Sequence, residues 1–233
     1  MRRQPEPIHL ASLTEADYRR VAGELAAARL AVFPTDTVYG VGGLLSPGVM
    51  RAIVSAKGRA SGKPLQVIYP SLDLLETTIA LDARLRDAVR CLLPGPFTLL
   101  LPYPQGLGFP PPGEVAHQVQ GTFGPRAETR ATLGVRVPRW PDAARLMAAL
   151  PFALIASSAN PSGDPAPRAL NEVGAGLLGA CDVALDGGTL AGMASTIVDL
   201  STYAGDGRWR VVRRGSVDED GVAALLAAAA GGG

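Results

Sequence analysis

The chain has 233 residues, and its 22 basic and 21 acidic side chains leave a formal net charge of +1 at pH 7. Apolar residues make up 47% and charged residues 18%, which excludes a disordered chain, whose signature is low hydrophobicity with high net charge. The balanced charge excludes a polycation of the histone type, and no stretch reaches the roughly 18 apolar residues of a membrane-spanning helix. The length predicts a single domain over 1–233. The N-terminus MRRQPEPIHL lacks the apolar core of a secretory signal, so we expect a cytoplasmic protein without membrane contact.

Strands and helices alternate along the predicted chain. A short arm or edge strand over 1–10 precedes a helix over 15–29, where Thr14 and Asp17 have capping-box spacing. Further strands are expected at 30–33, 65–69, 97–101, 133–137, 152–156, 183–185, 196–200 and 209–212. Further helices are expected at 47–57, 81–93, 141–149, from after 167 to about 178, and at about 219–230. The alternation predicts an α/β fold, and the closely spaced last strands indicate a mixed sheet.

Residues 102–131 interrupt this pattern with six prolines, five glycines and no periodicity. Proline cannot continue a helix or a central strand, and the segment is too long for an ordinary connection. We therefore predict a lid, a binding loop or a mobile segment here.

The use of lysine is unusual. Twenty of the 22 basic residues are arginine, and the only lysines, Lys57 and Lys63, lie in one loop with the sequence KGRASGK. An ammonium is a compact point charge that binds phosphate or carboxylate oxygens without needing fork geometry. Arginines also cluster at 126–139 and 208–214. A fold that joins these clusters would bind a polyanion.

Small polar side chains follow several predicted strands, where α/β proteins bind ligands. They are Thr35, Asp36, Thr37, Tyr39, Ser157, Ser158, Asn160, Ser195 and Thr196. No Walker phosphate loop, GxGxxG or GxSxG motif is present. The two histidines and the two cysteines, Cys91 and Cys181, lack metal-ligand spacing, so we expect reduced thiols and no tightly bound metal. Chemistry would then depend on positioning and charge stabilisation.

Eight sequence blocks occur in a fixed order. They are PTDTVYGVG (34–42), KGRASGKPL (57–65), PGPFTLLLP (94–102), LGVRVP (133–138), SSANPSG (157–163), LDGG (185–188), STIVDL (195–200) and RVVRRG (210–215). With these blocks the chain resembles the YrdC/TsaC family of threonylcarbamoyl-AMP synthases, in its short single-domain form. The resemblance implies a YrdC-like fold, a twisted mixed β-sheet flanked by helices with a basic concave cleft.

The resemblance also implies a reaction. L-threonine, bicarbonate and ATP, with Mg2+ accompanying the ATP, give threonylcarbamoyl-AMP and pyrophosphate. A transferase then passes the adenylate to tRNA, where threonylcarbamoyladenosine forms. The implied partners are thus the three substrates, that transferase, and tRNA or other double-stranded RNA.

Site residues follow from the resemblance position by position. Lys57 and Arg59 are expected to act catalytically as cations on the phosphates. The expected threonine-binding residues are Thr37, Arg136, Ser158 and Ser195. The expected ATP-binding residues are Arg59, Lys63, Thr132, Asn160 and Arg213.

Four positions depart from the pattern of the resemblance. Ile68 replaces a histidine that often contacts threonine, Arg168 a Ser or Thr that often contacts ATP, Ala194 a Glu, and Arg214 a Pro. These changes leave two alternatives open. One is carbamoyl-adenylate chemistry with another amine or acceptor. The other is a double-stranded RNA-binding protein without catalysis.

Overall fold

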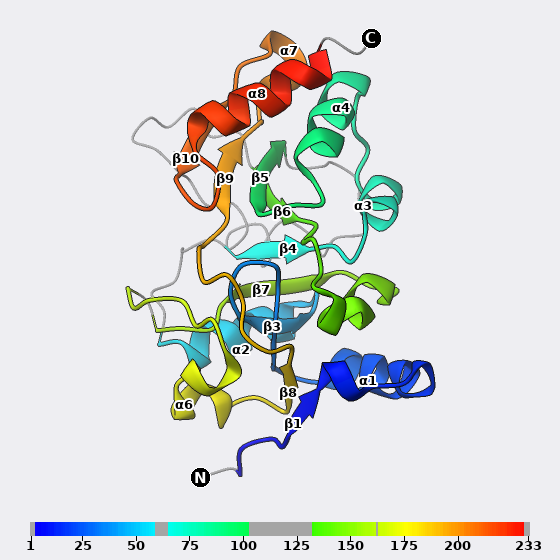
Figure 1. Ribbon diagram of the computed structural model, residues 1–233, viewed down its shortest axis with the longest axis vertical. Helices are drawn as coiled ribbons and strands as arrows, with labels where there is room; N and C mark the ends of the chain where they lie inside the picture. Colours follow the sequence, from blue (N-terminus) through cyan, green and yellow to red (C-terminus); the bar gives the residue numbers. More distant parts are fainter. Residues whose placement is uncertain (1–2, 59–64, 103–131, 162, 231–233) are drawn as a thin grey trace.

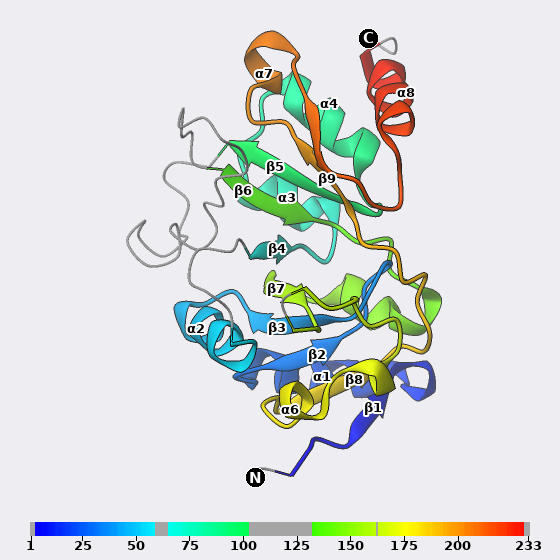
Figure 2. The ribbon, with the colours of Figure 1, turned by 90° about the vertical axis from the view of Figure 1, so that its left-hand side faces the viewer.

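The computed structural model describes residues 3–58, 65–102, 132–161 and 163–230 (Figure 1). Within these residues ten strands form one sheet in the order β1-β8-β2-β3-β7-β4-β6-β5-β9-β10. Figure 2 shows the strands stacked along the molecule, from β1 near the N-terminus to β9 and β10 near the C-terminus. The predicted loop at 103–131 lies outside the described residues.

The strands pair in both directions. They are β1 (Pro7–His9), β2 (Ala31–Phe33), β3 (Gly40–Leu44), β4 (Gln66–Ile68), β5 (Phe97–Pro102), β6 (Thr132–Arg136), β7 (Leu154–Ser158), β8 (Val183–Asp186), β9 (Thr196–Asp199) and β10 (Arg210–Arg213). The pairs β1–β8, β8–β2, β4–β6 and β5–β9 are parallel, and the other neighbours are antiparallel. The prediction of an α/β fold with a mixed sheet is confirmed, and β1 is an edge strand as expected.

Four of the described α-helices, α1 to α4, begin at capping side chains. The α-helices are α1 (Glu15–Ala27), α2 (Pro47–Ala56), α3 (Leu72–Thr78), α4 (Ala83–Leu92), α6 (Ala175–Leu178), α7 (Tyr203–Asp206) and α8 (Glu219–Ala230). The 3-10 helices are η1 (Leu10–Ser12), η2 (Asp142–Ala149) and η3 (Leu170–Glu172). Asp17 accepts hydrogen bonds from the Thr14 N–H and hydroxyl, as the capping spacing predicted. Ser46, Ser71 and Asp82 accept from the N–H groups that begin α2, α3 and α4.

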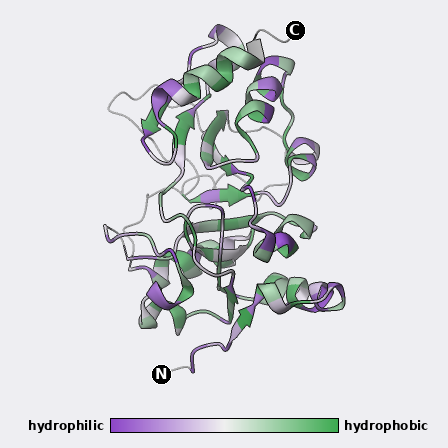
Figure 3. Cartoon of the chain, viewed as in Figure 1, coloured by the Kyte–Doolittle hydropathy of each residue, from purple (hydrophilic) through white to green (hydrophobic). Residues whose placement is uncertain are grey.

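Two apolar cores pack on the sheet. The larger contains Val67 of β4 and Val135 of β6, together with buried side chains of α2, α3, α4 and α8. The smaller contains Ile68 of β4 and buried side chains of α1 and η2. Figure 3 shows mostly hydrophobic residues in the central strands, whereas β4 and β10 also carry hydrophilic ones. Because side chains alternate along a strand, the residues between the members of the larger core face the other way. On β6 these are Thr132, Gly134 and Arg136, which are small or polar.

Several elements differ from the sequence-based expectation. No strand was predicted in the block at 34–42, but its last residues begin strand β3. Helices α3 and α7 were not predicted, and both are short. The helix expected to end near 178 is divided into η3 and α6, with Gly174 as the N-cap of α6. Glycine is a poor helix former, and it lies here inside the expected helix.

Strand β3 pairs with β7 only because residue 42 is a glycine. A Cβ atom on Gly42 would lie 2.0 Å from the Ile155 carbonyl oxygen. We expect Gly42→Ala to lower the free energy of unfolding by about 1–3 kcal/mol, as overpacking of a core does. Urea denaturation measures the loss. Gly23→Ala in α1 is the control, because its Cβ would meet nothing within 4 Å and alanine favours helix. Equal stability of the two variants would contradict the prediction.

Candidate active site

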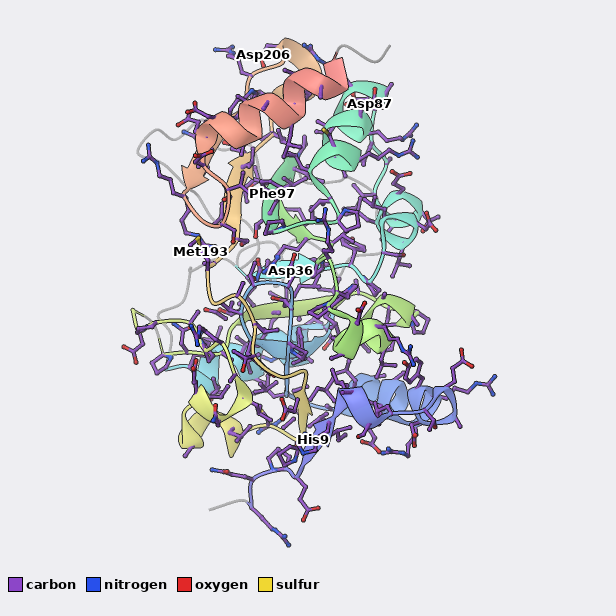
Figure 4. The ribbon with its side chains drawn as sticks, in the orientation of Figure 1. His9, Asp36, Asp87, Phe97, Met193 and Asp206 are labelled. Carbon is purple, nitrogen blue, oxygen red and sulfur yellow. The ribbon has the colours of Figure 1, made fainter. Side chains whose placement is uncertain are left out.

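The loop between β2 and β3 is a tight turn held by hydroxyl groups. Pro34 follows β2, and Thr35 Oγ1 then accepts hydrogen bonds from the N–H groups of Thr37 (3.2 Å) and Val38 (3.3 Å). Hydroxyls in such turns take the place of backbone partners. Asp36 lies near the middle of the molecule in the view of Figure 4, and its contacts are to two arginines at and after the end of β6. The turn thus presents one carboxylate and one hydroxyl, those of Asp36 and Thr37, to neighbouring strands.

This loop contacts other sequence blocks through its backbone. The carbonyl oxygen of Tyr39 accepts from Ala159 N–H at 2.9 Å, and that of Thr37 accepts from Gly192 N–H at 2.8 Å. The Tyr39 hydroxyl donates to the Gly188 carbonyl at 2.8 Å. Burial, above all, raises the pKa of this phenol, so it remains a donor at neutral pH. The blocks at 34–42, 157–163 and 185–188 therefore meet in space.

Arg136, at the end of β6, forms a buried ion pair with Asp36. Its Nη2 lies 2.6 Å from Asp36 Oδ1 and 3.0 Å from Thr37 Oγ1, and its side chain is 2% exposed. Asp36 Oδ2 accepts from Arg139 N–H at 3.1 Å. The turn and the end of β6 are thus joined by charge-assisted hydrogen bonds, which are the strong ones in proteins.

Burial acts on both members of this pair. It raises the pKa of Asp36 above its ordinary value, against the attraction of Arg136. It lowers the pKa of Arg136, as does the nearby positive charge of Arg213, whereas Asp36 opposes the shift. Because a guanidinium keeps its proton in proteins, Arg136 stays charged at neutral pH, and its charge favours the ionised form of Asp36.

Three buried polar atoms have no hydrogen-bond partner among the described residues. They are Arg136 Nε, Asn160 Oδ1 and Tyr69 Oη. Tyr69 follows β4 directly, and its N–H donates to the Arg136 carbonyl at 2.8 Å. Buried unpaired groups are rare in native proteins and call for an explanation. Arg136 Nε is a charged donor, and an anionic oxygen would satisfy it.

A second polar cluster joins β5, β10 and Ser195, the residue before β9. Arg213 Nη2 donates to the Ser195 carbonyl at 2.8 Å and to its Oγ at 3.2 Å. Ser195 Oγ lies 2.8 Å from Thr98 Oγ1 on β5, and both side chains are buried. Since Arg213 also lowers the pKa of Arg136, the two clusters interact electrostatically.

The side chain of Lys57 reaches the end of β7. Lys57 is the residue after α2, and its Nζ donates to Ser157 Oγ at 3.0 Å and to the Ser158 carbonyl. Asn160 is held from the same segment, through a bond from its Nδ2 to the Asp164 carbonyl. The lysine loop and the SSAN block are therefore neighbours.

The predicted site residues fall into three contacting pairs. Thr37 contacts Arg136, Ser195 contacts Arg213, and Lys57 contacts Ser158. Thr132 begins β6, and among the described residues it makes no hydrogen bond to these groups. Arg59 and Lys63 lie outside the described residues. These placements leave the individual roles as predictions.

Sequence reasoning missed two partners. Asp36 was recognised only as a polar loop residue, and Thr98 was not considered. A hydroxyl inside the otherwise apolar run FTLLL was the available signal for Thr98.

The arginine cluster at 208–214 is partly neutralised. Arg208 pairs with Asp206 at 2.6 Å, and Arg210 with Asp199 at 3.0 Å. Exposed pairs of this kind reduce the local positive field. The sequence-based prediction treated all four arginines of this cluster as available to a polyanion. In the structure, two of the four form ion pairs with aspartates.

For the described part of the chain, three features would indicate another function: a cluster of metal ligands, a reactive cysteine or a membrane-spanning helix. No group of three or more His, Cys, Asp or Glu side chains gathers there to hold a metal. Both cysteines are free thiols, and burial raises the pKa of Cys181 to about 12, so it is no thiolate nucleophile at neutral pH. Among the same residues no helix is long and apolar enough to span a membrane.

A family model for the Sua5, YciO and YrdC proteins, described as "Telomere recombination", matches residues 24–215. The chain belongs to the Sua5/YciO/YrdC family. The resemblance stated from the eight blocks is thereby confirmed. A member from Chromohalobacter salexigens, named threonylcarbamoyl-AMP synthase, is 32% identical over 192 residues, which cover 78% of this chain and 94% of that protein.

Solved structures of the family have the same fold. Sua5 from Pyrococcus abyssi complexed with L-threonine superposes with a TM-score of 0.72 at 27% identity, over 91% of this chain and 58% of that one. YciO of E. coli superposes with a TM-score of 0.69 over 92% of this chain, and at 22% identity this shows the fold alone. A Pyrococcus abyssi threonylcarbamoyl-AMP synthase is 31% identical over 82% of this chain, which spans 53% of that protein's length.

Proposed function

We propose that the protein is an L-threonylcarbamoyladenylate synthase, which makes threonylcarbamoyl-AMP and pyrophosphate from L-threonine, bicarbonate and ATP. The observation that carries the proposal is the buried group Thr37–Asp36–Arg136, which lies beside the Ser195–Arg213 cluster. A relative of the same fold is complexed with L-threonine. The names of several relatives support the same activity.

The reaction needs no protein nucleophile. The threonine amine attacks the carbon of CO2, which opens one C=O bond and releases an amine proton, or the carbon of bicarbonate, from which a C–O bond breaks and water leaves; a carbamate forms. A carbamate oxygen then attacks the α-phosphorus of ATP, and the bond from that phosphorus to the bridging oxygen breaks as pyrophosphate leaves. The protein must hold two anionic substrates together and stabilise the charge on phosphoryl oxygens, which positioned cations do well.

We assign the roles by position. Arg136 holds the threonine carboxylate, with Nε as the donor left available, and Thr37, Ser158 and Ser195 contact the same substrate. Lys57 and Arg213, with Arg59, Lys63, Thr132 and Asn160, bind the nucleotide. Mg2+ enters on the ATP phosphates, because the described site offers cations and hydroxyls rather than a carboxylate cluster. Passage of the adenylate by a transferase to tRNA, and a cytoplasmic location, complete the proposal.

Pyrophosphate release tests the function directly. We expect release from ATP only when L-threonine and bicarbonate are both present, because the carbamate is the nucleophile. Each amino acid is tested in turn, with and without bicarbonate, and mass spectrometry identifies the adenylate. Equal release with serine, or without any amino acid, would contradict the threonine assignment. Release with another amine alone would favour a related carbamoyl-adenylate reaction.

A further inference from the structure

A belt of hydrogen bonds crosses five strands of the sheet beside Arg136. Gln66 of β4 accepts at Oε1 from Thr98 Oγ1 of β5, at 3.0 Å. Thr98 Oγ1 lies 2.8 Å from Ser195 Oγ, which in turn accepts from Arg213 Nη2 of β10 at 3.2 Å. We call Gln66, Thr98, Ser195 and Arg213 the polar belt. The synthase assignment above gives Gln66 and Thr98 no role.

The belt passes over β6 at a glycine. Strand β6 lies between β4 and β5, and the pairing of Val67 with Val135 places Gln66 beside Gly134. Val67 and Val135 both point into the larger core, so Gln66, Gly134 and Arg136 share the opposite face. With no side chain at Gly134, the Gln66 amide can reach across β6 to Thr98. Gln66 and Arg136 are then diagonal neighbours on adjacent strands.

The donors and acceptors of the belt have one consistent direction. A guanidinium only donates, so the Ser195 hydroxyl accepts from Arg213 and can donate to Thr98. Thr98 accepts from Ser195 and donates its own proton to Gln66 Oε1. The amide oxygen of Gln66 is thereby occupied, and the two N–H donors of Nε2 are held in a fixed orientation.

Those two donors have no partner among the described residues, and Gln66 is half-buried, so it is partly open to solvent. On the same face, Arg136 Nε is a further unpaired donor. Donors on two adjacent strands suit a small anion with two oxygens, such as a carboxylate. A triphosphate, with its larger and more dispersed charge, would need more cations than one guanidinium and one amide supply.

We propose that Gln66 is a substrate-binding residue that donates from Nε2 to a carboxylate or carbamate oxygen of the amino-acid substrate, with Thr98 as the positioning residue that fixes its amide. The inference rests on the proposed synthase function and deepens it. Gln66 binds the amino-acid half of the reaction and makes no contact with the nucleotide.

Three variants test the proposal in steady-state pyrophosphate release. Gln66→Leu removes the donors and keeps the size, and we expect the KM for threonine to rise about tenfold, the loss of one hydrogen bond to a charged group. Gln66→Glu keeps an oxygen for Thr98 but places a negative charge opposite the carboxylate, so it should raise the KM for threonine further than Gln66→Leu. The KM for ATP should stay within about twofold in both. Gln4→Leu, at an exposed glutamine of the N-terminal arm, is the matched control.

The order of the two Gln66 variants separates binding from structure. A merely structural glutamine would tolerate glutamate, which retains the bond to Thr98, better than leucine. If Gln66→Leu fails to fold, the KM for threonine of Gln66→Glu alone tests whether Gln66 binds the substrate. An unchanged KM for threonine in a threonine-dependent enzyme, or an equal rise in the KM for ATP, would overturn the role of Gln66 alone. A wild-type protein without threonine-dependent release would overturn the proposed function, and this inference with it.

Discussion

Replacing Asp36 by alanine is expected to lower the free energy of unfolding by about 3–5 kcal/mol. The carboxylate lies 2.6 Å from Arg136 Nη2, and the two side chains are 9% and 2% exposed. Without Asp36 the guanidinium remains buried with no counter-charge among the described residues, and Arg139 N–H loses its acceptor. The cost arises from this uncompensated charge more than from the attraction that is lost. Urea denaturation followed by circular dichroism measures it.

Two further variants make this test specific. Asp206→Ala removes the partner of Arg208 in an exposed ion pair, and the unfolding midpoint should change little, because such pairs contribute little. A double variant, Asp36→Leu with Arg136→Met, removes both charges and should recover part of the stability lost in Asp36→Ala. If Asp36→Ala were no less stable than Asp206→Ala, the buried pair would not be a determinant of this fold.

Arg136→Lys is expected to lower kcat/KM for threonine about a hundredfold although the charge is retained. That factor corresponds to about 2.7 kcal/mol, within the range for a hydrogen bond to a charged group. Arg136 uses Nη2 for both Asp36 and Thr37, and Nε is left for a ligand. An ammonium cannot reproduce this planar fork. The KM for ATP should change by less than about threefold. Varying each substrate at saturating levels of the others separates the two constants.

Arg139→Lys is the matched control for that substitution. Arg139 contacts Asp36 through its backbone N–H, which a lysine retains, and its side chain is exposed. We expect nearly unchanged constants for both substrates. If Arg136→Lys raised the KM values for threonine and ATP equally, Arg136 would have a framework role and no place in the amino-acid subsite.

Several features of the protein could be predicted from local sequence. Hydrophobic runs ended by proline or glycine predicted most strands, and the Thr14–Asp17 spacing predicted the start of α1. Such patterns are local, since side-chain direction repeats with the period of the element. The eight ordered blocks indicated the family and, through it, the candidate residues Thr37 and Arg136. The local pattern did not predict strand β3 at Gly40–Leu44. This glycine-rich segment forms a strand because it pairs with β7.

The contacts that make up the site were decided by tertiary structure alone. Asp36 and Arg136 are 100 residues apart, and Gln66 reaches Thr98 across β6, which lies between β4 and β5. Strand order in a mixed sheet depends on pairing between distant segments, and no local periodicity encodes it. The sequence by itself determined which side chains share a face of each strand, and only the folded sheet decided which of them meet.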